Sequence, residues 1–275
     1  MNKTKVLKSA LYQGVCLLIG LVIIAPVVYC VLVSFMQPSE VLTKQLHLLP
    51  DGLYLGNYLT VLTKTKIFRY MLNSLVVAFV SSLVQVLLCS LCAYGFAFFR
   101  FKGCRWLFFA VVGCMIIPGD VLIFQNYFTV SDLHLINTYL GMMIVYFVSA
   151  ANIFIMRQNF VTYSLSVRDA AYVDGCGDFK FYWRILMPSS VPILITVFIS
   201  SFVGAWNAYL WPLLVTNKDE MRTAQTAVAM LNAADSNPYG TVMAASTLIL
   251  LPSILVFILF QRRVVAGMMT GAVKE

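Results

Sequence analysis

Long stretches without a single charged residue constrain most strongly how this chain can fold. Five stretches contain no Asp, Glu, Lys or Arg: 9–39, 70–99, 133–156, 185–217 and 236–261. Each is longer than the roughly 20 residues that an α-helix needs to cross the hydrocarbon core of a bilayer. A sixth apolar stretch, 106–128, is interrupted only by Asp120. The pattern predicts six transmembrane helices.

The composition supports an all-α membrane protein. Charged residues make up only 11% and hydrophobic residues 61% of the chain, and the mean hydropathy is +0.87. A soluble domain carries about a quarter charged residues. Strands of a membrane barrel alternate in polarity over about ten residues, whereas 76–99 is apolar on every side. The apolar run that ends near Met36 is too long for a cleaved signal peptide, so we interpret it as the first span.

The basic residues predict the orientation. With the N-terminus inside, the inner segments carry thirteen of the 19 basic residues, which favours both termini on the cytoplasmic side. A nucleic-acid surface is not expected, because these residues are scattered over four segments. The predicted segments are an inner N-terminus at 1–10, spans at 11–36, 70–99, 106–128, 135–156, 189–214 and 241–261, outer segments at 37–69 and 215–240, and an inner loop at 157–188, with a single transmembrane domain over 70–263.

The sequence contains no recognisable catalytic motif. It has no G-x-x-x-x-G-K-[ST] phosphate-binding loop, no H-E-x-x-H and no G-x-S-x-G, and we therefore expect no enzyme activity in this chain. The pair Cys89-x-x-Cys92 has no second pair and no histidine beside it, so small packing side chains are a better interpretation than a metal site.

The polar stretch 169–188, DAAYVDGCGDFKFYWRILMP, stands out in so apolar a chain. It predicts two short helices on the cytoplasmic surface, separated by a turn at Gly175 and Gly177. Ser166 is the expected N-cap of the first helix, with Asp169 as its acidic partner. The second helix is expected near 179–186, with Phe179, Tyr182 and Trp183 on an aromatic face, and to end at Pro188.

The spacing Asp169-Ala170-Ala171-x3-Gly175-x9-Ile185-x-Met187-Pro188 resembles the "EAA" loop, E-A-A-x3-G-x9-I-x-L-P, of permease subunits of ATP-binding-cassette importers. Asp169 replaces the glutamate of the motif, and Met187 replaces its leucine. The pairs at 57–58 and 73–74 and the segments 93–103, 206–213 and 267–275 are similar to the carbohydrate-importer branch, in particular to the six-span permease of maltose-type importers.

The resemblance implies a type I ABC importer permease fold with a cytoplasmic coupling helix that docks on a separate ATPase. Asp169, Ala170, Ala171 and Gly175 would contact the ATPase, and Ile185 and Pro188 would join the coupling helix to the fifth span. The implied partners are a second permease subunit in a heterodimer, two ATPase subunits that bind ATP and Mg²⁺, an extracytoplasmic solute-binding protein, membrane lipid and a carbohydrate solute. No cofactor is expected in this chain, and the location is a bacterial cytoplasmic membrane.

Four residues are candidates for the solute pathway. Asp120 follows Pro118-Gly119, which should break or loosen the third span. A charged side chain inside a span usually faces the protein interior or a cavity, although Asp120 could also be solvated near the outer interface. Trp206, Asn207 and Tyr209 offer the aromatic faces and polar groups that sugars prefer. An aromatic belt at the interface is the alternative for Tyr209.

Three functions compete. The first is the permease subunit of a binding-protein-dependent importer for a carbohydrate, with a polyol phosphate such as glycerol-3-phosphate as the alternative solute. The second is a stand-alone secondary carrier, which would usually show inverted repeats and several charges within its spans. The third is a membrane-embedded enzyme or a structural subunit.

Overall fold

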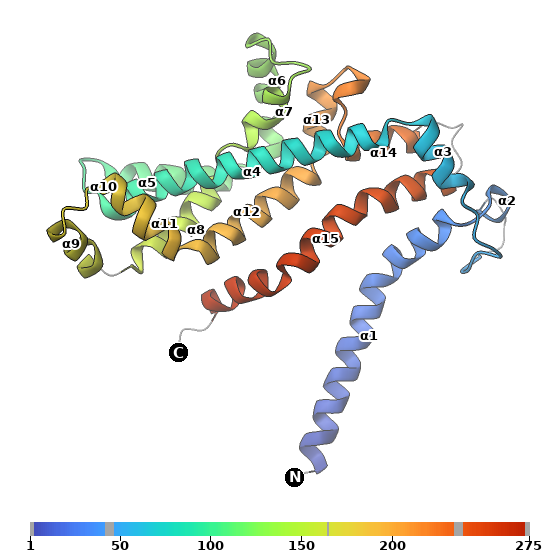
Figure 1. Ribbon diagram of the computed structural model, residues 1–275, viewed down its shortest axis with the longest axis horizontal. Coiled ribbons are helices and arrows are strands. Elements are labelled where there is room, and N and C mark those ends of the chain that lie inside the picture. The colour runs from blue at the N-terminus through green and yellow to red at the C-terminus, as the bar shows by residue number, and fades with distance from the viewer. Residues whose placement is uncertain (1–2, 42–46, 164, 234–238, 273–275) are drawn as a thin grey trace. The chain divides into compact units, whose positions relative to one another are not determined.

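The computed structural model describes residues 3–41, 47–163, 165–233 and 239–272, and every regular element in these ranges is a helix (Figure 1). The chain packs as two compact units. One comprises Met1–Phe68 with Ala227–Leu251, and the other comprises Arg69–Thr226 with Pro252–Glu275. The all-α prediction is confirmed for the described residues.

Three helices are long and apolar enough to cross a membrane: Leu11–Ser34, Ile67–Phe98 and Tyr239–Val256. Three further pairs of helices pass the same test only when each pair is taken together, and each pair is bent by more than 40°. The total reaches six if every bent pair is one span. The count of six spans and the placement of both termini inside therefore stay predictions.

The smaller of the two units contains α1 (Lys3–Ser34), α2 (Pro38–Val41), α3 (Gly56–Lys64) and the first part of α15 (Tyr239–Ala272). Asn57 on α3 is buried, and its amide donates to the carbonyls of Ser34 at 3.0 Å and Met36 at 2.8 Å. These bonds satisfy two carbonyls at the end of α1, where the helix leaves its last acceptors without partners. A Cβ at Gly240 would lie 2.5 Å from the Asn57 amide nitrogen, so a larger residue at 240 would displace the Asn57 side chain from these two bonds.

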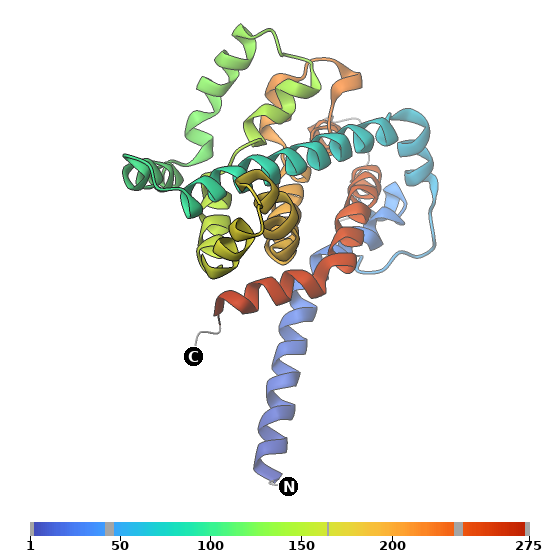
Figure 2. The ribbon, with the colours of Figure 1, turned by 60° about the vertical axis from the view of Figure 1, so that its left-hand side comes forward.

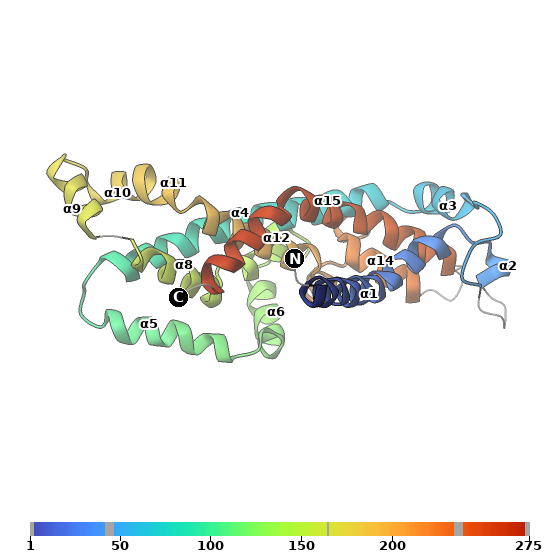
Figure 3. The same cartoon turned by 90° about the horizontal axis from the view of Figure 1, so that it is seen from below.

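The larger unit is arranged along α4 (Ile67–Phe98). Its other helices are α5 (Cys104–Gly113), α6 (Ile123–Asp132), α7 (Tyr139–Met143), α8 (Ala150–Val161), α9 (Leu165–Val173), α10 (Asp178–Phe181), α11 (Met187–Ser189), α12 (Val191–Trp206) and α13 (Leu210–Val215), and α14 (Ala224–Ala233) begins in it. Helices α9, α10 and α11 gather at the same end of α4 as α5 (Figures 1 and 3).

The third predicted span is not straight. Its two halves, Cys104–Ile116 and Gly119–Asp132, meet at 92° and run in different directions in Figures 2 and 3. The bend confirms the break predicted at Pro118-Gly119. Proline cannot donate a backbone hydrogen bond and disfavours helical backbone in the residue before it, and Ile117 is indeed extended, with φ −80° and ψ 116°.

The fourth predicted span is bent by 50° between Tyr146 and Ala150, and the sequence analysis missed this break. Ser149 is the N-cap of the second half, and its hydroxyl accepts from the backbone N–H of Asn152 at 3.4 Å. The fifth span is separated by a 78° bend from the helix that precedes it, at Ser190 between Pro188 and Pro192.

Candidate functional site

Helix α9 ends in a glycine turn that its sequence dictates. Gly175 has a φ of +74°, in the left-handed region, and its N–H donates to the carbonyl of Tyr172 at 3.0 Å. The N–H of Cys176 reaches the carbonyl of Ala171 at 2.8 Å. This pair of bonds is the Schellman motif, which satisfies the last carbonyls of a helix and requires a left-handed residue after its end. The predicted stop at Gly175 is confirmed.

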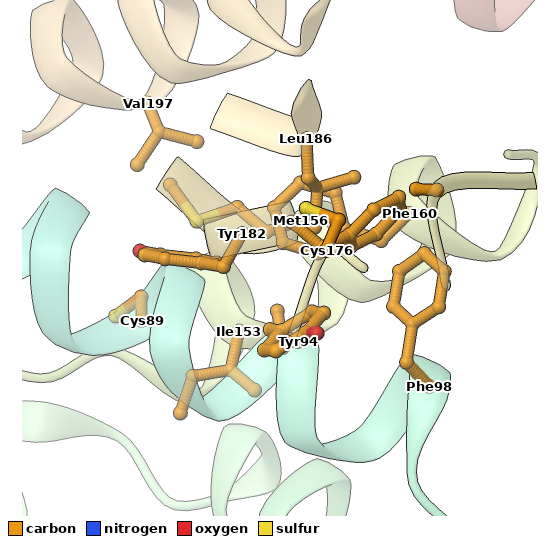
Figure 4. Close-up of a cluster of buried hydrophobic side chains, with 13 residues drawn as sticks. Cys89, Tyr94, Phe98, Ile153, Met156, Phe160, Cys176, Tyr182, Leu186 and Val197 are labelled. Carbon is orange, nitrogen blue, oxygen red and sulfur yellow. The ribbon is translucent and has the colours of Figure 1, made fainter. Parts of the chain in front are cut away.

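The inner side of this turn is part of a hydrophobic core. Ala171 and Cys176 are buried with Phe181, Tyr182 and Leu186 from the following helical turns (Figure 4). Their partners come from α4, α8 and α12: Cys89, Ala93, Tyr94, Phe98, Ile153, Met156, Phe160 and Val197. The α9–α11 segment (residues 165–189) is therefore not a loose loop, because its own side chains are packed against three spans.

An ion pair and several hydrogen bonds hold the two halves of the α9–α11 segment together. Arg168 pairs with Asp178 across the glycine turn at 3.1 Å, and it also donates to the backbone carbonyl of Phe98 at 2.7 Å. The hydroxyl of Tyr172 donates to the same carboxylate, and this bond raises the pKa of the tyrosine. Tyr94 on α4 donates to the backbone carbonyl of Asp178 at 3.1 Å. These interactions join α9 and α10 to the end of α4.

Neither Arg168 nor Asp178 is among the site residues predicted from the sequence. Arg168 was counted only as one of the inner basic residues that set the orientation. The two residues are ten positions apart and come together only because the chain reverses at Gly175. The guanidinium also lies 5.5 Å from the ring centre of Phe98 and 5.4 Å from that of Phe99, which adds cation–π attraction.

The outer side of α9 carries part of the predicted contact set. Asp169 and Ala170 are exposed, and so is Gly175. Ala171 is different, because its side chain is only 7% exposed and belongs to the core. Consecutive residues point about 100° apart around a helix, so three in succession do not all face the same side. Ala171 is thus a packing residue in this structure, and its contact with the ATPase stays a prediction.

Two details of the prediction are corrected. Helix α9 begins at Leu165, so Ser166 lies in its first turn and not at the N-cap, and residue 164 is outside the described residues. The predicted aromatic face is divided. Phe179 and Trp183 are exposed with ring centres 6.2 Å apart, whereas Tyr182 is buried and its hydroxyl pairs with that of Ser90 at 2.6 Å.

Ile185 and Pro188 lie where the segment continues toward α12. Ile185 is half-buried against the core, and Pro188 is exposed in α11. Between α10 and α11 the chain forms one π-helical turn over Tyr182–Leu186, with the N–H of Met187 donating to the carbonyl of Tyr182. The helix does not end at Pro188 as predicted, because the 78° bend falls after Ser189.

The predicted pathway residues separate into two groups. Asp120 and Tyr209 line one cavity of about 360 Å³ in the larger unit, although they are 89 positions apart in the chain. The other residues that line it are Gly119, Ile123, Asn126, Val145, Tyr146, Ala208, Leu210 and Trp211. The break at Pro118 brings Asp120 to this cavity, and the turn after α12 brings Tyr209. Asn126 and Tyr146 add polar groups that the sequence analysis missed.

Trp206 and Asn207 do not line this cavity. Trp206 is 2% exposed and stacks on Phe202, with ring centres 6.0 Å apart. Its indole N–H has no hydrogen-bond partner among the described residues. Asn207 follows the last residue of α12, and its side-chain oxygen accepts from Gln225 at 3.4 Å. A direct contact of Trp206 with a solute would require this part of the chain to open.

Polar side chains also fix the outer segment that follows α13. Asn73 is fully buried and donates to the carbonyls of Glu220 at 2.7 Å and Arg222 at 2.9 Å, while it accepts from the hydroxyl of Tyr139 at 2.6 Å. The next residue, Ser74, accepts from the N–H of Ala224 at 2.8 Å. In the sequence, the pair Asn73-Ser74 stood out only as part of a resemblance. In the structure, its side chains hold residues 220–224 against α4.

The whole chain is similar to permease proteins of known transport systems. The chain is 32% identical over 270 residues to the sn-glycerol-3-phosphate transport system permease protein UgpE of Brucella melitensis, covering 94% of this chain and 96% of the relative. It is 29% identical over 251 residues to the arabinooligosaccharides transport system permease protein AraQ of Bacillus subtilis, covering 90% and 89%.

The fold has a solved counterpart. A chain of a bacterial ABC transporter involved in the import of the acidic polysaccharide alginate superposes with a TM-score of 0.79 and 23% identity, over 95% of this chain and 98% of the other. The fold is thus that of an ABC importer permease. Residues 71–270 match the model of one protein family. The chain belongs to the family of binding-protein-dependent transport system inner membrane components.

Proposed function

We propose that this chain is the membrane-spanning permease subunit of an ATP-driven importer and that the α9–α11 segment receives the movement of a separate ATPase. One observation carries the proposal: α9 exposes Asp169 and Ala170, while Ala171 and Cys176 fix the same helix in a core shared with three spans. A force applied to the exposed side would therefore move α4, α8 and α12 together, because a packed core does not deform continuously.

The family and the names of the relatives support the assembly. A permease of this kind works with a second permease subunit, two ATPase subunits and a solute-binding protein. ATP and Mg²⁺ bind the ATPase subunits, and this chain supplies the pathway. Transport then alternates between two states of the permease, and the ATPase changes the free-energy difference between them.

The proposed solute is a carbohydrate. AraQ is named for arabinooligosaccharides, and the cavity that contains Asp120 and Tyr209 is suited to neutral hydroxyl groups. Its described lining offers a carboxylate, an amide from Asn126 and two tyrosines, together with the indole ring of Trp211, against which the apolar face of a sugar can lie.

Glycerol-3-phosphate is the second candidate, because several relatives are named for its transport. Proteins bind phosphate mainly with arginine, lysine and backbone N–H groups. No lysine or arginine is among the described residues that line the cavity, and Asp120 would repel a phosphate. The chemistry of the cavity therefore favours the carbohydrate.

The coupling role is tested with Asp169→Lys in the assembled complex, reconstituted in vesicles with its solute-binding protein. We expect solute uptake and solute-stimulated ATP hydrolysis to fall together, while the amount of assembled permease is unchanged. Asp169→Glu is the matched control, because it keeps the charge and supplies the glutamate of the motif. Normal uptake and ATP hydrolysis in Asp169→Lys would rule out the coupling role of this face.

The solute is tested by uptake of a labelled oligosaccharide panel and of labelled glycerol-3-phosphate into the same vesicles. Asp120→Asn and Tyr209→Phe should reduce oligosaccharide uptake, since each alters a polar group in the cavity. Ile123→Val is the control in the same lining. Uptake of glycerol-3-phosphate alone would overturn the carbohydrate proposal and leave the permease proposal intact.

A further inference from the structure

A second and larger cavity lies apart from both groups of residues discussed so far. It has a volume of about 800 Å³ and is bounded by the end of α4, the loop that follows it, α5 and α8. The residues that line it are Phe96, Ala97, Phe99, Arg100, Phe101, Gly103, Cys104, Arg105, Trp106, Phe108, Phe109, Val112, Phe154, Arg157 and Gln158. It therefore combines arginines with a largely aromatic wall.

The polar part of this cavity is wholly cationic or neutral. Arg100, Arg105 and Arg157 line it, and no Asp or Glu is among its described lining residues. The Nε of Arg157 is buried and lacks a hydrogen-bond partner among the described residues, while its Nη1 donates to Gln158 at 3.1 Å. A buried donor without a partner is costly, so an anion that reached this nitrogen would be bound favourably.

The aromatic part of the cavity fixes two of these arginines. The guanidinium of Arg157 lies 4.6 Å from the ring centre of Phe108, which stacks on Phe154 at 6.2 Å. The guanidinium of Arg105 lies 5.5 Å from the ring centre of Phe109. Cation–π contacts leave the N–H edge of a guanidinium available for a second partner.

The outer edge of the cavity is apolar. Trp106 is 79% exposed and Phe109 is 52% exposed, and both belong to the segment that the sequence analysis assigns to the third span. In a bilayer these rings contact acyl chains. Arg100 and Arg105 lie in the predicted cytoplasmic loop between two spans, at the depth where lipid head groups are found.

We propose that this cavity binds an anionic phospholipid, with the lipid phosphate on the three arginines and an acyl chain along the aromatic wall. Basic pockets between spans on the cytoplasmic side are known to hold such head groups. A free phosphate would satisfy the arginines but leave the aromatic rings uncovered. A zwitterionic lipid such as phosphatidylcholine also carries a phosphate, but its choline cation would then lie beside the remaining arginines of the lining and be repelled by them.

The position of the site gives it a consequence for transport. Phe99 lines the cavity and also contacts Arg168, the residue that holds the α9–α11 segment to α4. Phe108 contacts both Phe96 on α4 and Phe154 on α8. A bound lipid would therefore pack beside the same helix ends on which the α9–α11 segment rests.

The test uses quenching of Trp106 by lipids brominated on their acyl chains. The full chain is placed in phosphatidylcholine nanodiscs that contain a small fraction of either brominated phosphatidylglycerol or brominated phosphatidylcholine. The signal of Trp106 is the difference between the natural chain and Trp106→Phe. We expect phosphatidylglycerol to quench Trp106 more strongly than phosphatidylcholine at the same fraction.

Arg105→Gln and Arg157→Gln should each weaken the apparent affinity for phosphatidylglycerol about fivefold, the effect expected for one basic residue near an anionic lipid. Arg105 is exposed, so its substitution leaves the core intact and keeps the test valid if Arg157→Gln fails to fold. Lys102→Gln is the matched control, because it removes one charge from the same loop and does not line the cavity.

Three results would overturn the proposal. Equal quenching by both lipids, or an equal loss in Lys102→Gln and Arg105→Gln, would show only general attraction to a charged surface. Binding of soluble inorganic phosphate that weakens in Arg105→Gln, without stronger quenching by phosphatidylglycerol than by phosphatidylcholine, would show that the arginines bind a free anion, and the lipid would then not be the ligand.

Discussion

The glycine turn after α9 makes the α9–α11 segment unusually sensitive to one methyl group. Gly175 has a φ of +74°, and a Cβ placed there would meet nothing within 4 Å. The cost of Gly175→Ala is therefore conformational and not a clash. For a residue with a Cβ, the left-handed backbone conformation is less stable than the right-handed one by roughly 1–2 kcal/mol. This free energy corresponds to a factor of about 5 to 30 in the population of the closed turn.

Hydrogen exchange of the backbone measures this population directly. The N–H groups of Gly175 and Cys176 close the turn on the carbonyls of Tyr172 and Ala171. In Gly175→Ala we expect the N–H groups of residues 175 and 176 to exchange roughly 5 to 30 times faster, because the turn opens more often. Gly175→Asn should lose less, since asparagine tolerates the left-handed region better than alanine.

Gly177→Ala is the matched control, only two residues away. Gly177 has a φ of −69° and a ψ of 166°, which any residue adopts, and a Cβ there would also meet nothing within 4 Å. Its substitution should leave the exchange at 175 and 176 unchanged. If both alanine variants accelerate exchange equally, or neither does, the left-handed turn does not control the end of α9 and the reasoning is refuted.

Three further predictions concern contacts that hold the larger unit together. Arg168→Gln removes the ion pair with Asp178 and the charge-assisted hydrogen bond to the Phe98 carbonyl. It should lower the free energy of unfolding by about 1.5–3 kcal/mol, which is measured as a lower thermal midpoint. Arg184→Gln, at an exposed site, should leave the midpoint unchanged. Asn73→Ala removes the side chain that pairs with the Arg222 carbonyl and the Tyr139 hydroxyl, and it removes one of the donors to the Glu220 carbonyl, which keeps Arg69 at 3.4 Å. The substitution should cost about 1–3 kcal/mol for each buried group that loses its partner. Faster proteolysis of the segment after α13 is the measurement, and an unchanged digestion pattern would contradict it. Gly141→Ala places a Cβ 2.2 Å from the carbonyl oxygen of Leu135, which is a backbone atom and cannot rotate away. The assembled permease should therefore be recovered in much smaller amounts. Normal recovery would show that the backbone relaxes around this contact at little cost.

The sequence predicted the elements that depend on local chemistry. The charge-free stretches predicted the apolar helices, and Pro118-Gly119 predicted the 92° bend. The stop after α9 followed from a glycine at the right place. These features depend on a few neighbouring residues, and proline and glycine act on the backbone in the same way in every fold.

The sequence could not predict which side of α9 is buried. Asp-Ala-Ala offers two small residues in succession, and either alanine could face outward. The choice of Ala171 for the core depends on Cys89, Met156 and Phe160, which lie on helices from distant parts of the chain. The Arg168–Asp178 pair was missed for the same reason, because it forms across a turn whose geometry must be known first.

The break in the fourth span was also beyond sequence reasoning. Ser149 caps the new helix, but serine occurs within membrane helices as well and marks no break by itself. The cavity around Asp120 needed three separate segments to be placed together, and two of its polar residues, Asn126 and Tyr146, carry no sequence motif.

The central claim is that the exposed side of α9 meets an ATPase, and a photo-crosslinking amino acid at Ala170 tests it most directly. In membranes containing the assembled complex, illumination should join position 170 to the ATPase subunit, with a yield that changes when ATP is bound. The same amino acid at Trp106, which is predicted to face lipid, should give no such product. Crosslinks to the ATPase from position 106 but not from position 170 would contradict the account.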